Sequence, residues 1–146
     1  MKTPTTRFGL LEFEEKDLLT FRTGIIGFPE STRFVLLDQE DGPAKWLQSV
    51  DAPDLAFLII DPVLLKPDYR IEVAQEDIPE LATEDEFDLV VFVFLTIPSG
   101  DPGGITANLR GPVIINRRSQ LAKQIILKDD LPVCYPVFSS CFSLSR

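Results

Sequence analysis

The sequence predicts an all-β (mainly β) protein: a small single-domain β-barrel-like fold with at most one or two short helices. Short runs of apolar or alternating residues recur along the chain, and clusters of Asp, Gly, Pro and Asn separate them. Strands with that spacing and such turns are typical of all-β barrels and sandwiches. The longest apolar run, residues 89–95, is rich in Val and Phe. It predicts a strand that is buried on both faces or central in a barrel.

We expect one domain over residues 1–146. A chain of 146 residues buries roughly 70% of its unfolded surface on folding, so a sizeable core is possible. No apolar run approaches the roughly 18 residues of a membrane span, and the first residues do not resemble a signal peptide. A cytoplasmic protein with no membrane partner is therefore expected. Residues 131–146 form a C-terminal tail whose placement the sequence leaves open.

The segment from residue 106 to residue 127 predicts a β-meander. Residues 106–109, 113–115 and 122–127 are its expected strands, with Gly111-Pro112 as the break between the first two. Asn108 and Asn116 stand beside the apolar run, where a short amide side chain readily bonds to a turn backbone. Turn chemistry is therefore the favoured interpretation of both asparagines.

The first third of the chain predicts a hairpin followed by a corner. Residues 5–13 predict an edge strand and residues 18–21 a second strand, with a charged turn between them. Gly24 and Gly27 then suggest a backbone with φ > 0 or a close approach, and Pro29 fixes the exit direction. A phosphate-binding loop needs more glycines and a following helix with Lys and Ser or Thr. A structural corner is therefore predicted.

Three further strands are predicted at residues 33–37, 45–50 and 55–60, and Pro62 ends the last of them. Trp46, the single tryptophan, is expected in the core rather than at a binding surface, because an indole buries a large apolar area.

The middle of the chain contains the one plausible helix, at residues 75–82, after a short strand or connector at residues 69–73. Beyond it, period-2 geometry lets only one alternating set of the 88–95 strand face inward, unless both faces are covered. The barrel interior is expected to contain Val90, Phe92 and Phe94 or their alternate neighbours, together with Leu47, Phe57, Val113 and Ile115.

Composition argues against an enzyme and against a metal site. The chain has no histidine, which removes the commonest general base, the commonest metal ligand and every imidazole-dependent triad. The two cysteines, Cys134 and Cys141, match no zinc spacing, and both are expected to be buried free thiols. We therefore expect no catalytic residue, no metal and no cofactor.

The net charge of −9 is concentrated in one segment. All nine charged residues between residues 71 and 109 are acidic, and the rest of the chain is balanced. Such a field repels nucleic acid and attracts basic partners, although a charge run is also often only a solvated face. We expect no direct nucleic-acid binding. The candidate partner-binding residues are Glu72, Glu76, Asp77, Glu80, Glu84, Asp85 and Glu86.

Three segments in register resemble the bacterial flagellar assembly factor family. They are residues 24–30, residues 45–62, and residues 106–124. The resemblance implies a small, non-enzymatic β-barrel-like protein. It also implies two partners: the carbon storage regulator, an RNA-binding translational repressor that the family antagonises, and flagellin, which competes for the family protein. The residues that carry the resemblance are Gly24, Gly27, Phe28, Pro29, Trp46, Asp61, Pro62, Asn108, Gly111, Pro112 and Asn116.

Two other classes of function remain open to the residues themselves. A barrel interior lined by Phe92, Phe94 and Trp46 would suit a carrier of a small apolar ligand. A pair of facing carboxylates in the acidic segment would suit an enzyme that acts on sugars, but such pairs arise by chance in any segment this acidic.

Overall fold

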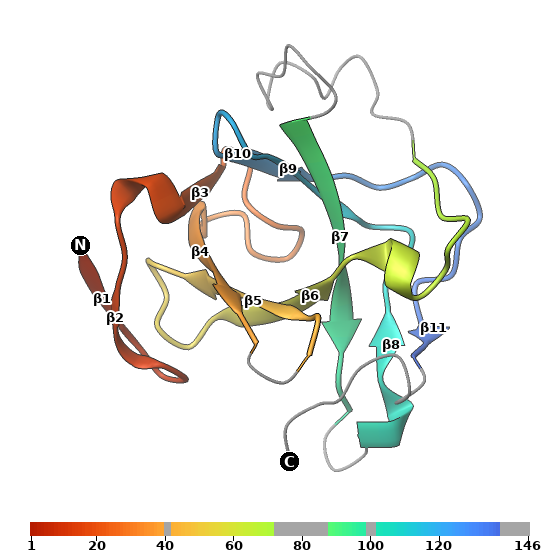
Figure 1. Cartoon of the computed structure of the whole chain (residues 1–146), viewed down its shortest axis with the longest axis horizontal. Coiled ribbons are helices and arrows are strands. Elements are labelled where there is room, and N and C mark those ends of the chain that lie inside the picture. The colour runs from red at the N-terminus through yellow and green to blue at the C-terminus, as the bar shows by residue number, and fades with distance from the viewer. Residues whose placement is uncertain (40–41, 72–87, 99–101, 138–146) are drawn as a thin grey trace.

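The computed structural model describes residues 1–39, 42–71, 88–98 and 102–137. Strands dominate this part of the chain, and its helical elements are short 3₁₀ turns (Figure 1). The first six strands are β1 (Lys2–Thr5), β2 (Gly9–Glu12), β3 (Leu18–Phe21), β4 (Arg33–Asp38), β5 (Lys45–Ser49) and β6 (Ala56–Ile60). They are followed by β7 (Leu89–Thr96), β8 (Thr106–Ala107), β9 (Val113–Asn116), β10 (Leu121–Gln124) and β11 (Tyr135–Pro136). The 3₁₀ turns are η1 (Glu15–Asp17), η2 (Pro62–Leu64) and η5 (Pro102–Gly104).

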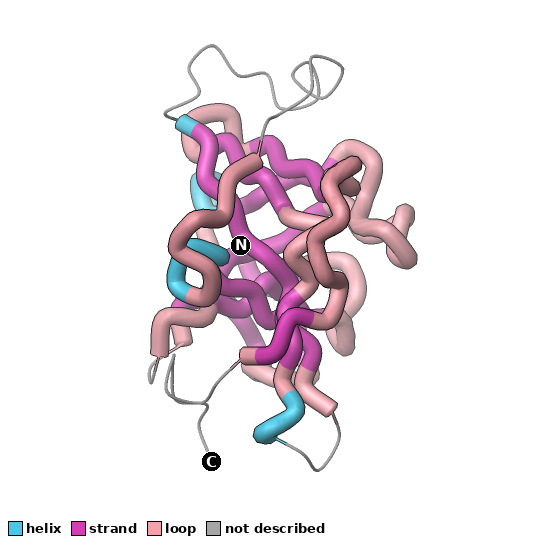
Figure 2. The backbone as a smooth tube through the Cα atoms, turned by 90° about the vertical axis from the view of Figure 1, so that its right-hand side faces the viewer, coloured by secondary structure: helices cyan, strands magenta, loops and turns pink. Residues whose placement is uncertain are grey.

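The main sheet closes into a barrel. Its strands follow the order β11-β8-β7-β6-β5-β4-β3-β10-β9, and β9 also pairs with β7. That second pairing completes a ring of β3, β4, β5, β6, β7, β9 and β10 (Figures 1 and 2). The β10–β3 pairing is parallel, and the other pairings in the ring are antiparallel. The predicted β-barrel-like fold is confirmed.

The predicted β-meander is wrong, because β8 does not pair with β9. Both strands pair with β7: Ala107 lies opposite Leu95, and Val113 lies opposite Phe92. Leu95 and Phe92 are three residues apart on β7, whereas Ala107 of β8 and Val113 of β9 are six residues apart along the chain. Gly111-Pro112 therefore belongs to a bulge that interrupts one long partner of β7, rather than to a turn that reverses the chain. Only β9 and β10 form the expected hairpin.

Strand β7 is covered on both faces. Phe92 belongs to the inner cluster of the barrel, and the partly buried Val90 and Phe94 pack against that cluster. Val93 and Leu95 alternate with them and join a second cluster outside the barrel. The predicted interior set is confirmed, since the inner cluster contains Leu47, Val113 and Ile115, and Phe57 packs against it.

The predicted opening hairpin is displaced. The expected strand at residues 5–13 is instead a turn followed by β2, and β2 pairs with β1 at residues 2–5 through that turn, which ends at Gly9 with φ +67°. Strand β3 pairs with β4 and β10 instead. Gly9 reverses the chain inside the segment that the sequence pattern suggested was continuous. Figure 1 shows the resulting β1–β2 hairpin outside the barrel.

The strands predicted in the middle of the chain are confirmed as β4, β5 and β6. Asp61 then caps η2, since its side chain accepts a hydrogen bond from Val63 N at 3.0 Å. Residues 69–71 form no strand, and the hydroxyl of Tyr69 instead donates to Leu109 O at 2.8 Å. The helix predicted at residues 75–82 lies outside the described residues.

The first half of the C-terminal tail docks on β8. Strand β11 pairs with β8, and the bonds Leu109 N to Pro132 O and Val137 N to Ile105 O, each 3.0 Å, extend the contact. The prediction that Cys134 is buried is wrong. Cys134 is exposed, and it lies between Pro132, whose carbonyl bonds to Leu109, and Tyr135, which pairs with Ala107. Cys141 lies outside the described residues.

Replacing Phe92 by Ala is expected to destabilise the barrel strongly. Phe92 is 9% exposed in the inner cluster, and truncating a buried Phe costs roughly 3–5 kcal/mol in free energy of unfolding. Leu64→Ala is the matched control, because Leu64 is 50% exposed and should lose less than about 1 kcal/mol. Urea unfolding measures both, and similar losses would contradict the assignment of Phe92 to the core.

The hydroxyl of Tyr69 is expected to make stability depend on alkaline pH. Burial raises its pKa from 10.0 to about 12. The protonated form is the one that the fold favours, so its stabilisation is complete below pH 10 and is lost as the pH rises towards 12. Denaturant unfolding across this range should show the decline, and Tyr69→Phe should remove the part due to Tyr69. An equal decline in both proteins would assign it to other groups.

Candidate functional site

The predicted acidic partner-binding residues cannot be placed. Glu72, Glu76, Asp77, Glu80, Glu84, Asp85 and Glu86 all lie outside the described residues. The described chain resumes at Asp88, whose carbonyl accepts a hydrogen bond from Arg117 N at 2.9 Å. The site is therefore built from the residues that carry the family resemblance and from the surfaces around them.

The predicted corner is a tight turn that begins at Ile25. Phe28 N donates to Ile25 O at 2.6 Å, and Gly27 has φ +91°, as the third position of a type II turn requires. Gly24 has φ +71°, and a Cβ atom there would lie 2.6 Å from the backbone of Pro29. Both glycines are thus needed for the backbone path, and the corner is confirmed.

Gln124 joins this corner to the bulge between β8 and β9. Its Oε1 accepts from Ile26 N at 3.0 Å, and its Nε2 donates to Gly111 O at 3.0 Å. A Cβ atom on Gly111 would lie 3.0 Å from the side-chain amides of Asn108 and Gln124, so the bulge leaves little room there. Three segments that are far apart in sequence therefore meet at one end of the barrel.

The two asparagines form the turns that the sequence predicts. Asn108 Oδ1 accepts from Arg110 N at 3.1 Å and from Gly111 N at 3.0 Å, which holds the bulge. Asn116 Oδ1 accepts from Arg118 N at 2.9 Å in the β9–β10 turn. Neither residue needs a ligand to account for its position.

An apolar rim surrounds this end of the barrel. Ile26, Phe28 and Ile126 are 59%, 42% and 59% exposed, and Ile126 Cδ1 lies 3.4 Å from the Cβ position of Gly111. Phe28 packs edge-on against Phe57 at 5.4 Å between ring centroids. Phe57 in turn lies 5.1 Å from the ring of Phe94. The rim therefore continues the hydrophobic core out to solvent, which is typical of interaction surfaces.

Trp46 is not in the barrel interior, but it is partly buried and packs against the second hydrophobic cluster, outside the barrel. Leu47 is fully buried inside, and alternation along β5 turns the indole outward. The indole is half-buried under the turn of the N-terminal hairpin, with the guanidinium of Arg7 4.2 Å from its ring centroid and the ring of Phe8 6.0 Å away. Trp46 and Phe92 therefore do not line one cavity, as the carrier hypothesis required.

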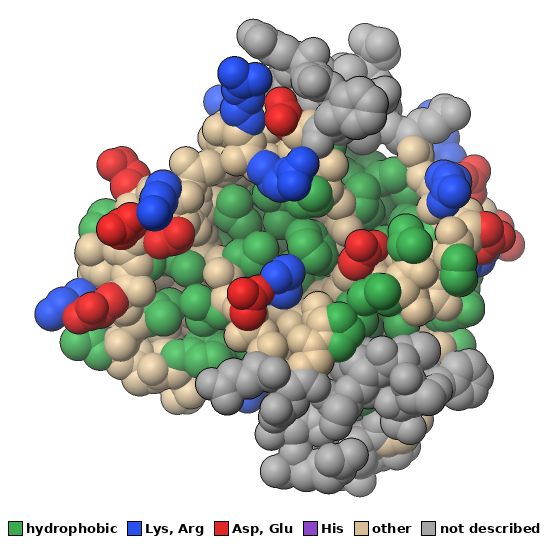
Figure 3. All heavy atoms as spheres, viewed as in Figure 1, with side chains coloured by type: hydrophobic (Ala, Val, Ile, Leu, Met, Phe, Trp, Pro, Cys, Tyr) green, Lys and Arg blue, Asp and Glu red, His purple; other side chains and the backbone are tan. Residues whose placement is uncertain are grey.

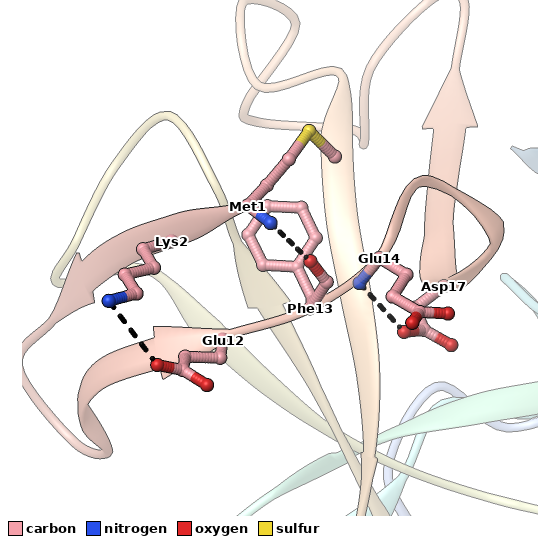
Figure 4. A pocket seen from close by; sticks show the side chains of 6 residues that line it. All are labelled: Met1, Lys2, Glu12, Phe13, Glu14 and Asp17. Atoms are coloured by element: carbon pink, nitrogen blue, oxygen red, sulfur yellow. Dashed lines mark hydrogen bonds and ion pairs between the residues drawn. The ribbon is translucent and has the colours of Figure 1, made fainter.

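A shallow cavity of about 330 Å³ lies at the other end of the hairpin (Figure 4). Lys2 pairs with Glu12 at 3.5 Å on one side of it, and Asp17 Oδ2 accepts from Glu14 N at 3.0 Å on the other. Met1 and Phe13 lie between these pairs (Figure 4). No sequence pattern predicts this cavity, because it depends on the pairing of β1 with β2.

The face of the molecule in Figure 3 does not concentrate one charge. Acidic and basic side chains stand next to one another around the face in Figure 3, and hydrophobic side chains fill its middle. Exposed ion pairs among the described residues include Lys45 with Asp38 and Arg110 with Asp130. Among the described residues, no three Asp, Glu, Cys or His side chains are grouped to hold a metal, and no helix could cross a membrane.

Comparison with known proteins identifies the family of this chain. The model of the FliW protein family matches residues 2–137. This chain belongs to the FliW family. The predicted membership in the bacterial flagellar assembly factors is thereby confirmed.

Individual FliW proteins are similar to this chain over most of their length. The flagellar assembly factor FliW of Caldanaerobacter subterraneus subsp. tengcongensis is 43% identical over 89% of this chain and 87% of its own. That of Magnetococcus marinus is 41% identical over 90% of this chain and 82% of its own. A crystal structure of a flagellar assembly factor FliW superposes with a TM-score of 0.83 at 36% identity, covering 94% of this chain and 96% of that one.

Sequence reasoning missed the role of Gln124 and the exposure of Ile26 and Ile126 in this FliW family member. Lys123 and Gln124 are the polar residues of the predicted 122–127 strand. The bonds of Gln124 explain why β10 ends there rather than at residue 127. The rim needed the structure, because isolated exposed aliphatic residues cannot be recognised from sequence.

Gly24→Ala is expected to destabilise the corner more than Gly27→Ala. Both positions have positive φ, which costs about 1–2 kcal/mol for a residue with Cβ. At Gly24 the new Cβ also collides with Pro29. At Gly27, apart from its two chain neighbours, no described heavy atom lies within 4 Å of the Cβ position. The total loss at Gly24 should be roughly 2–5 kcal/mol. Thermal and urea unfolding compare the two, and equal losses would show that the collision is relieved.

Proposed function

We propose that the protein is a non-enzymatic, protein-binding regulator of flagellum assembly in the cytoplasm. In this proposal it binds the carbon storage regulator, relieves the repression of flagellin synthesis, and is itself sequestered by flagellin. The observation that carries the proposal is the family match over residues 2–137, together with relatives named flagellar assembly factors. The proposal thus extends family membership to particular partners, which the experiments below test.

The charge distribution supports an electrostatic route to antagonism. Residues 72–88 contain eight carboxylates and no cation. Bound beside a basic RNA-binding surface, such a segment raises the free-energy cost of binding phosphates there. It need not occupy the RNA site itself. Specificity would then come from apolar contacts, for which the rim of Ile26, Phe28 and Ile126 is available.

The carrier hypothesis receives less support. The described side chains that fill the barrel include Phe21, Phe34, Leu47 and Ile59, each fully buried. Phe21 and Phe34 pack edge to face at 5.3 Å between centroids. The cavity at the N-terminal hairpin lies outside this interior and is lined by charged side chains. A closely filled small barrel suits a scaffold for surface contacts better than a ligand container.

Neutralising the acidic segment tests the electrostatic route. The variant Glu76→Gln, Asp77→Asn, Glu80→Gln and Glu84→Gln should bind the purified carbon storage regulator more weakly at low salt and release less RNA from it. The effect should fade with salt, because the Debye length shrinks from about 10 Å at 0.1 M to about 3 Å at 1 M. Calorimetry measures affinity, and a labelled RNA measures release.

A second variant with the same change in charge is the control. Glu15→Gln, Glu30→Gln, Asp54→Asn and Asp129→Asn alter exposed carboxylates outside the segment and should leave both measurements unchanged. Full RNA release by the first variant at low salt would disprove the electrostatic route. Failure of the unaltered protein to bind either the regulator or flagellin would disprove the proposed function itself.

A further inference from the structure

One pairing in the barrel ring, between β3 and β10, is shorter than the others. Its register joins Thr20 to Leu121 and Phe21 to Ala122, whereas each other pairing in the ring spans at least three residues of each strand. It is also the parallel pairing of the ring, and parallel ladders are slightly less stable per residue than antiparallel ones. We call this contact the β3–β10 seam (Figure 1). Strand pairing therefore holds the ring least firmly at the seam.

Backbone hydrogen bonds extend the pairings on either side of the seam. Phe21 N donates to Thr32 O at 2.7 Å beside the β3–β4 pairing, and Ile125 N donates to Pro112 O at 3.0 Å beside the β9–β10 pairing. At the seam itself, two glutamine side chains, one at each end, reinforce the short register. The closure of the barrel therefore depends in part on those two side chains.

Gln120 fastens one end of the seam through its backbone and its side chain. Its carbonyl accepts a hydrogen bond from Thr20 N at 2.9 Å. Its Nε2 donates to Leu18 O at 2.9 Å and to Lys16 O. A side-chain amide has two N–H donors, so both have acceptors in η1 and at the start of β3. Gln120 thus ties the chain that enters β10 to the chain that enters β3.

Gln124 fastens the other end of the seam. Its Oε1 accepts a hydrogen bond from Ile26 N at 3.0 Å, in the corner that follows β3. The same side chain is held in place by the bond from its Nε2 to Gly111 O. Between the two glutamines the seam consists of the two residue pairs of its register.

The backbone of Gln120 is strained in the closed barrel. Its φ is +63°, and it is the one described residue other than glycine with a positive φ. That region is unfavourable for a residue with a Cβ atom, and such a conformation persists only where surrounding contacts compensate for it. When the seam opens, Gln120 is free to adopt an ordinary φ. Relief of this strain therefore lowers the free-energy cost of opening at the seam.

The seam covers the inner cluster of the barrel. Phe21 and Ala122, which are register partners across it, are 0% and 2% exposed and belong to that cluster. Separation of β3 from β10 uncovers both side chains, while β3 stays paired with β4 and β10 stays paired with β9. The product is an open sheet whose apolar face is accessible at one margin, rather than an unfolded chain.

We propose that the β3–β10 seam is a gate: the barrel opens there in a cooperative step that precedes global unfolding, and Gln120 is the latch that keeps it closed. Folded proteins open locally in such cooperative units, at a lower free energy than global unfolding. Opening gives solvent access to the inner cluster along the seam. The gate requires no partner, so its test is independent of the proposed function.

Two adjacent amides of β3 test the gate in the unaltered full chain. Thr20 N donates across the seam to Gln120 O, whereas Phe21 N donates to Thr32 O on the β4 side. Hydrogen exchange of both amides is followed by NMR at several low concentrations of urea. We expect the Thr20 amide to exchange at least about tenfold faster than the Phe21 amide, at a rate that rises with urea, because a cooperative opening exposes surface.

Two substitutions distinguish opening of the seam from global unfolding. Val35 is 2% exposed and pairs within β3–β4, which stays intact in the open state. Val35→Ala should therefore speed exchange of the Phe21 amide by at least about fivefold and leave that of Thr20 unchanged. Gln120→Ala removes hydrogen bonds that exist only in the closed barrel, so both amides should exchange at least about tenfold faster.

Gln120→Gly separates the latch from the strain. It lacks the same side-chain bonds as Gln120→Ala, but glycine adopts a positive φ without strain. The Thr20 amide should therefore exchange about three- to tenfold more slowly in Gln120→Gly than in Gln120→Ala.

A disulfide across the seam is the converse test. Thr20 and Leu121 are register partners, and neighbouring strands lie about 4.8 Å apart, within the range that a disulfide spans. The variant combines Thr20→Cys and Leu121→Cys with Cys134→Ser and Cys141→Ser. In its oxidised form the amides at positions 20 and 21 should exchange at similar rates, and reduction should restore the difference.

Four results would overturn the gate. The first is a Thr20 amide that exchanges no faster than that of Phe21 in the unaltered protein, and the second is a Thr20 rate that urea does not change, which indicates fraying of one bond. The third is equal acceleration of both amides by Val35→Ala. The fourth is an undiminished difference in the oxidised disulfide variant. The first two need no variant, so they decide the matter even if a variant fails to fold.

Discussion

The fold depends on the pairing of β7 with β9. Strand β7 already pairs with β6 on one edge, and the carbonyls of Asp88 and Phe94 accept bonds from Arg117 N and Asn108 N on the other. Asp88 and Phe94 are six positions apart, and because this separation is even, their carbonyls point to the same edge. Closure there removes the open edges that an extended sheet would carry, and it forces one face of each strand in the ring into the interior.

Closure of the barrel also explains which residues occupy the corner that begins at Ile25. A closed barrel has an opening at each end, and in this protein turns and loops, rather than strands, lie at one of them. Here the turn at Ile25, the bulge at Gly111 and the end of β10 meet, and Gln124 bonds the first two. Glycines occupy the positions where a side chain would collide with backbone or with the two amides. Gly24, Asn108 and Gly111, which are among the residues that carry the family resemblance, thus make this junction possible.

The described surface has features that suit contact with other proteins. The barrel interior holds aromatic and aliphatic side chains, exposed apolar residues gather at the rim, and one hairpin leaves a strand edge unpaired within the described chain. These are features by which proteins bind other proteins: apolar anchors in the centre, charges around them, and backbone groups at an edge.

The sequence by itself determined the local features of this protein. Strands β4 to β7, the glycine corner and the turns at Asn108 and Asn116 follow from period-2 patterns and turn chemistry, which act within a few residues. The strand spacing is typical of both barrels and sandwiches, and the resemblance to the family favoured the barrel. Tertiary structure alone decided the rest: the shared pairing of β8 and β9 with β7, the parallel contact of β10 with β3, the outward side of Trp46 and the exposure of Cys134. Each depends on the register between segments far apart in the chain, and no local pattern specifies that register.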